Sequence, residues 1–150
     1  MYTRQDWALQ RQAFWTSFGR YLKPIPSASG EKVNWTNYKT GLPGLYLRMD
    51  AGRGIATISL QYQVKDEAIR EIFIRKMELL LPELLEINPA WRWETAAPTE
   101  NGVISQLHQA IPGLDIFRQE DWPALISFFK TNLLQLDVFW TANKDIFLWG

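Results

Sequence analysis

The chain has 150 residues, 47% hydrophobic, 21% charged and 14% aromatic, a balance that is typical of one folded domain and excludes a disordered or collagen-like chain. The chain has no cysteine and one histidine, a composition that excludes disulfides, cysteine nucleophiles, zinc–cysteine centres and multi-histidine metal sites. No metal or cofactor is therefore expected. The net charge is zero, but the charges are unevenly distributed: residues 1–65 hold nine basic and three acidic residues, and residues 66–150 hold seven and thirteen. This asymmetry fits either an anion-binding face or an ordinary solvated surface.

The first predicted element is a helix over 4–22, where large apolar residues recur at helical spacing. A loop rich in proline, serine and glycine follows at about 23–33 and is predicted to be mobile. Residues 34–38 are predicted to form a short strand or an extended segment. The apolar stripe of the helix consists of Trp7, Phe14, Trp15, Phe18 and Leu22.

Two strand-like runs, 45–49 and 55–64, flank a glycine-containing link and predict a β-hairpin. Their alternation predicts one apolar and one polar face. The apolar face would carry Leu45, Leu47, Met49, Ala56, Ile58, Leu60, Tyr62 and Val64. The polar face would carry Tyr46, Arg48, Asp50, Thr57, Ser59, Gln61 and Gln63.

A second helix is predicted to begin after Asp66, which would cap it, and to end at about 81 or 86, with Pro82 kinking or ending it. Residues 91–94 and 103–110 predict a second hairpin, although 103–110 also fits a helical period. The buried stripe of the helix would be Ile69, Ile72, Phe73, Leu80 and Leu84.

The last helix is predicted over about 122–149, with Asp121 as its N-cap and Pro123 in its first turn. The resulting order, α-β-β-α-β-β-α, predicts a single α+β domain over 1–150, with an antiparallel sheet built from two hairpins and packed against three helices. The core stripe of the last helix would be Trp122, Leu125, Ile126, Phe129, Leu133, Leu136 and Trp140.

Further apolar residues of this helix lie off the core stripe, on more of its circumference than one face of a monomer easily covers. Either the first helix and loop 24–30 cover this second side, or a twofold partner does. We favour a homodimer through the C-terminal helix. The residues concerned are Phe128, Leu134, Phe139, Ile146, Phe147 and Trp149.

The polar face of the first hairpin combines an aromatic ring, cations and amide or hydroxyl groups, which suits weak binding of nucleic acid or another polyanion. The alternative is the solvated outer face that antiparallel sheets commonly have. The candidate binding residues are Tyr38, Lys39, Tyr46, Arg48, Arg53 and Gln61.

A second candidate site resembles the metal-dependent motif of restriction-type nucleases, in which an Asp precedes an acidic residue or Gln, a spacer and a Lys. Asp50, Gln63 and Lys65 match this order. In a tight hairpin, however, Asp50 would lie at the turn and Gln63 at the far end of the return strand. The lone His108 is predicted to be a surface or edge residue.

No segment is apolar for the roughly 18 residues that a membrane span requires, so no membrane partner is expected. The first residues carry charges where a secretory signal would be apolar. Together with the lack of cysteine, these features predict a cytoplasmic protein.

Four segments, 37–41, 45–50, 66–71 and 121–130, resemble a bacterial family known as domain of unknown function 4268, and the likeness covers about 10–140. The most specific piece is the helix start Asp121-Trp122-Pro123. In that family the domain occurs alone or at the C-terminus of proteins with nuclease-like N-terminal regions, and the resemblance implies no defined activity.

Taken together, the sequence favours a non-enzymatic binding or interaction domain. The alternative is a nuclease-related enzyme or accessory domain, and the sequence alone does not decide whether the protein is an enzyme.

Overall fold

The computed structural model describes residues 3–149. Three α-helices and a four-stranded antiparallel sheet confirm the predicted α+β class and element order. Two short 3₁₀ turns, η1 (Trp35–Asn37) and η2 (Gln119–Asp121), lie between them. The helices are α1 (Arg4–Leu22), α2 (Glu67–Ile87) and α3 (Trp122–Trp149). The strands are β1 (Leu45–Ala51), β2 (Arg53–Tyr62), β3 (Arg92–Thr99) and β4 (Gly102–Asp115).

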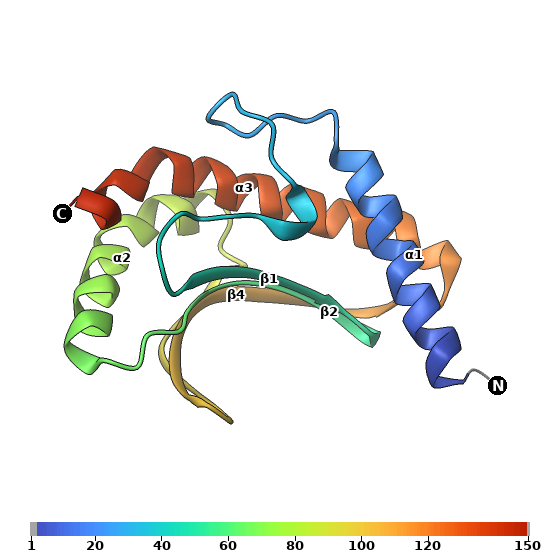
Figure 1. The fold of residues 1–150 in the computed structure, drawn as a ribbon, viewed down its shortest axis with the longest axis horizontal. Coiled ribbons are helices and arrows are strands. Elements are labelled where there is room, and N and C mark those ends of the chain that lie inside the picture. The colour runs from blue at the N-terminus through green and yellow to red at the C-terminus, as the bar shows by residue number, and fades with distance from the viewer. Residues whose placement is uncertain (1–2, 150) are drawn as a thin grey trace.

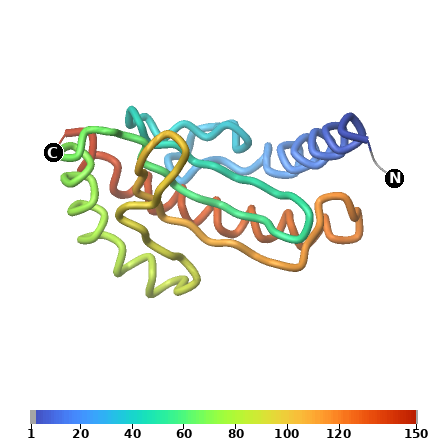
Figure 2. The backbone as a smooth tube through the Cα atoms, turned by 90° about the horizontal axis from the view of Figure 1, so that it is seen from below, coloured from blue at the N-terminus to red at the C-terminus, as the bar shows by residue number. Residues whose placement is uncertain are grey.

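The two hairpins join through their second strands, which gives the strand order β1-β2-β4-β3. All three helices lie on one side of this sheet, with α3 running along it (Figure 1). Seen from the opposite side, the strands lie in front of α3 and no helix crosses them (Figure 2). The domain therefore has two layers, and one face of its sheet is free of helices.

The first hairpin has the predicted alternation. On β2, Ala56, Ile58 and Leu60 are at most 3% exposed and face the helices. The chain enters β1 through Gly44, whose φ is 87° and where an added Cβ would lie 2.6 Å from Val64 Cγ2. Only glycine suits this conformation without strain, so this residue helps to fix where β1 begins.

The predicted buried stripe of α2 is wrong at two positions. Ile69 and Ile72 are 49% and 55% exposed. Compared with the predicted orientation, the helix is rotated so that a stripe beginning at Phe73 faces the sheet and α3. Pro82 lies inside the helix, which continues to Ile87 instead of ending at 81. The buried residues of α2 are Phe73, Ile74, Met77, Leu81 and Leu84.

The structure decides three local expectations: it replaces the extended segment at 34–38 by a 3₁₀ turn, confirms the strand at 103–110, and shows which contact Asp121 makes. Residues 35–37 form a 3₁₀ turn capped by the side chain of Asn34, not a strand. Residues 103–110 belong to β4, because they pair with both β2 and β3. Asp121 lies in η2, and its carboxylate accepts the N–H of Asp115 at 3.0 Å, so it ties the end of β4 to the start of α3.

The core stripe of α3 is confirmed at Leu125, Phe129, Leu133, Leu136 and Trp140, each at most 2% exposed. The second side of this helix is only partly covered within the chain, and α2 supplies part of that cover.

On that second side, Phe139 is buried. The ring of Phe147 lies 5.3 Å from the rings of both Phe73 and Trp140. Ile146 and Trp149 remain 44% and 85% exposed.

The segment between α1 and β1 is fastened to α3 by a buried carboxylate. Asp137 is 2% exposed and accepts hydrogen bonds from the Ser27 hydroxyl at 2.7 Å, the Ala28 N–H at 2.7 Å and the Tyr38 hydroxyl at 2.6 Å. Burial, reinforced by the hydrogen bond to Asp137, raises the pKa of Tyr38 above its ordinary value. Each donor is therefore satisfied inside the protein.

Within the described residues, no helix is both long and apolar enough to cross a lipid bilayer.

Candidate functional site

A row of polar side chains crosses the helix-free face of the sheet. The register pairs Arg48 with Ser59, Ser59 with His108, and His108 with Arg92. Directly paired residues of antiparallel strands point to the same side, so these four side chains share one face. The row spans three inter-strand spacings, about 14 Å. It ends on an exposed arginine at each edge of the sheet.

A second row lies beside the first and contains Tyr46, Gln61, Gln106 and Glu94. Gln106 Nε2 donates to Glu94 Oε1 at 2.9 Å. His108 Nε2 of the first row lies 2.7 Å from the same oxygen, which makes an ion pair when the imidazole is protonated. The single carboxylate of these two rows is thus engaged by its neighbours, while the two arginines have no acidic partner within salt-bridge distance in residues 3–149.

The middle of the face is held by hydrogen bonds that run along β2. Gln63 Nε2 donates to Gln61 Oε1 at 3.0 Å, and Gln61 Nε2 donates to Ser59 Oγ at 2.9 Å. Beside them, the guanidinium carbon of Arg48 lies 4.8 Å from the centre of the Tyr46 ring. Tyr46 keeps 42% of its surface exposed. The face therefore combines a pre-ordered polar centre with an accessible aromatic ring.

The structure gathers some of the predicted binding residues and separates others. Tyr46, Arg48 and Gln61 lie together on the open face. Tyr38 and Lys39 line a cavity of about 340 Å³ at the β1 edge, which Tyr46 and Arg48 also line. The Tyr38 hydroxyl, however, is bonded to Asp137.

Arg53 lies apart from the other candidates. It is the first residue of β2, at the turn of the hairpin, and its guanidinium carbon is 4.8 Å from the Trp7 ring of α1.

The nuclease-like residues are not brought together. Asp50 pairs with Thr57 beside the hairpin turn, whereas the Gln63 N–H donates to the carbonyl of Gly44 at the other end of β1. Thr57 and Gln63 are six positions apart along the extended chain, which is about 20 Å. Among residues 3–149, no three His, Cys, Asp or Glu side chains are grouped as a metal ion would need.

Sequence reasoning missed Arg92 and His108 as members of the open face. Both depend on the pairing of β4 with β2 and β3, which joins residues far apart in the chain. The available signal was the pair of polar residues Gln106 and His108 on either side of Leu107, which a helical period in the same segment obscured.

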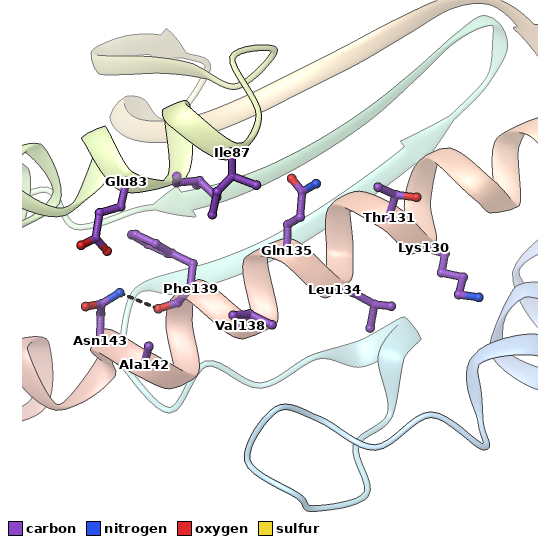
Figure 3. Close-up of a pocket in the computed structure, with 11 residues that line it drawn as sticks. Glu83, Ile87, Lys130, Thr131, Leu134, Gln135, Val138, Phe139, Ala142 and Asn143 are labelled. Atoms are coloured by element: carbon purple, nitrogen blue, oxygen red, sulfur yellow. Dashed lines mark hydrogen bonds between the residues drawn. The ribbon is translucent and has the colours of Figure 1, made fainter.

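A second surface feature lies on the helical layer, away from the open face. Helices α2 and α3 border a groove of about 530 Å³, lined mainly by apolar side chains (Figure 3). Ile87 and Val138 in this groove are 73% and 58% exposed. Lys130 lies at one end of it and Glu83 at the other (Figure 3).

Comparison with known protein families places the chain in a family of undefined activity. The family model described as Domain of unknown function (DUF4268) covers residues 10–144. The chain belongs to the DUF4268 family. Membership in DUF4268 confirms the resemblance predicted over about residues 10–140 and assigns no activity. No curated protein matches this DUF4268 chain, and no solved structure matches it either.

Proposed function

We propose that this protein is a binding domain whose open sheet face takes up single-stranded nucleic acid. The observation that carries the proposal is the row Arg48–Ser59–His108–Arg92, which crosses all four strands on the side without helices. An arginine at each edge offers a phosphate contact, and the polar centre between them lies on the two central strands of the sheet.

The neighbouring row suits the bases. Proteins that hold single strands combine cations for the backbone with aromatic rings on which bases stack. Tyr46 supplies an exposed ring, and the amides of Gln61 and Gln106 supply donors and acceptors for base edges. Two arginines and one ring make a small site, so we expect weak binding that depends strongly on salt.

The test is fluorescence anisotropy of a labelled single-stranded oligonucleotide, titrated with protein across a range of salt concentrations. Each lost phosphate contact lowers the slope of log affinity against log salt by about 0.7 for a single strand. Replacing both Arg48 and Arg92 by alanine should therefore reduce the slope by about 1.4. The matched control is Arg20→Ala with Arg75→Ala, which removes the same charge from α1 and α2.

Heparin distinguishes nucleic-acid recognition from general anion binding, because it carries negative charge without bases. Tyr46→Ala should weaken oligonucleotide binding and leave heparin binding unchanged. If the control pair weakens oligonucleotide binding as much as the Arg48 and Arg92 pair does, the proposed face is wrong. It is also wrong if the unmodified protein does not bind the oligonucleotide at low salt. If Tyr46→Ala binds both ligands as tightly as the unmodified protein does, the face recognises negative charge alone.

A further inference from the structure

The groove between α2 and α3 is a separate surface from the open sheet face. Its floor is built from Leu134, Val138, Phe139 and Ala142 of α3, and Ile87 of α2 forms part of its wall (Figure 3). Exposed large apolar side chains grouped in one hollow typically mark a protein contact.

The ends of this groove carry opposite charges. Lys130 stands at one end, and Glu83 lies beside Asn143 at the other (Figure 3). The two ends are thirteen residues apart along α3, about 20 Å at 1.5 Å per residue. Neither Lys130 nor Glu83 has an oppositely charged partner within salt-bridge distance in residues 3–149.

This charge arrangement is complementary to itself under a twofold rotation. If two copies of α3 lie antiparallel and cross between Leu134 and Val138, Lys130 of each copy comes opposite Asn143 of the other. Each Lys130 then faces Glu83 of the other copy, and the apolar residues between them meet in the middle. A parallel arrangement would instead bring like charges together.

We propose that the groove is the contact surface of a homodimer, formed by antiparallel α3 helices of two copies and closed at each end by a Lys130–Glu83 pair. This interface lies on the helical layer, so the dimer would leave both open sheet faces free. The proposal does not depend on what the sheet face binds.

The first measurement is the mass of the protein in solution by light scattering at high micromolar concentration. A dimer has twice the chain mass of 17.5 kDa. Val138→Glu places two like charges near the twofold axis and should give the monomer mass. Its control is Leu79→Glu on α2, at a side chain that is 83% exposed and does not line the groove; this variant should stay dimeric.

The charge pair is tested by reversal and rescue. Lys130→Glu alone and Glu83→Lys alone should each weaken the dimer, because like charges then meet at both ends. The double variant restores opposite charges and should recover much of the dimer. Circular dichroism of each variant checks that the fold is retained.

The register is tested by crosslinking, for which a chain without cysteine is convenient. A Val138→Cys variant treated with a short bis-maleimide should give a covalent dimer, and a Leu79→Cys variant should not. A monomeric mass for the unmodified protein would overturn the proposal. A dimer that survives Val138→Glu, or whose charge reversals are not rescued by the double variant, would also overturn it.

Discussion

The two faces of the sheet are made of alternate residues of the same strands, and they differ in what their side chains contact. On β2, Leu60 is 3% exposed beneath the helices, whereas Gln61 points to the opposite side and bonds to Ser59. The covered face is held by burial of apolar area, and the open face by hydrogen bonds between neighbouring polar groups. The first arrangement supplies most of the stability, which leaves the second free to bind a ligand.

The largest contrast should come from truncating neighbours on these two faces. Leu60→Ala removes a buried side chain and should destabilise the protein by about 2–5 kcal/mol. Gln61→Ala, one residue further along β2, should cost about 0.5 kcal/mol, as most surface substitutions do. Urea unfolding of both variants measures the difference, and similar midpoints would contradict the assignment of faces.

A buried polar group on the covered side should behave like a core residue. Asp137→Asn removes the charge that accepts from Ser27, Ala28 and Tyr38. Leaving buried donors poorly paired costs about 1–3 kcal/mol, so we expect a loss of about 2 kcal/mol in the free energy of unfolding. Urea unfolding measures this loss. Hydrogen exchange on the same variant tests the predicted mobility of loop 23–33, whose backbone amides should exchange faster than in the unmodified protein.

On the open face, the effect should appear in binding and not in stability. Tyr46→Ala should lower the affinity for a single-stranded oligonucleotide by about 1–3 kcal/mol, the usual value of one base stacked on an aromatic ring. Its unfolding midpoint should stay close to that of the unmodified protein. A stability loss comparable to that of Leu60→Ala would show that the ring is part of the core.

The smallest expected effect concerns alkaline pH. Because the pKa of Tyr38 is raised in the folded state, the unfolded chain releases this proton first, near the ordinary value of 10.0. The contribution of this protonated hydroxyl to the free energy of unfolding is complete below about pH 10 and is lost as the pH rises further. Tyr38→Phe lacks this titration, so its free energy of unfolding should fall less steeply above pH 10. Parallel curves for the two proteins would contradict the assignment.

Local sequence signals were sufficient for most of the fold. The alternation of β2 predicted both of its faces, and the apolar spacing in 122–149 predicted α3 and its core stripe. The failures have physical causes. Ile69 and Ile72 fit a helical stripe, but packing of α2 against α3 and the sheet selects a stripe that begins with Phe73.

The candidate site was predictable only within one hairpin. Tyr46, Arg48 and Gln61 come together through the short link between β1 and β2, which the sequence shows. Arg92 and His108 join them through strand pairing between distant segments, which no local pattern specifies. The groove was missed for the same reason, since it requires the relative placement of two helices.

We propose that the open face, and not the helical layer, binds single-stranded nucleic acid. The most direct measurement is an NMR titration of isotope-labelled protein with an oligonucleotide at low salt. We expect amide shifts to concentrate at Arg48, Ser59, Arg92 and His108, while α3 around Val138 stays unchanged. Shifts confined to the helices, or none at any oligonucleotide concentration, would contradict binding at the open face.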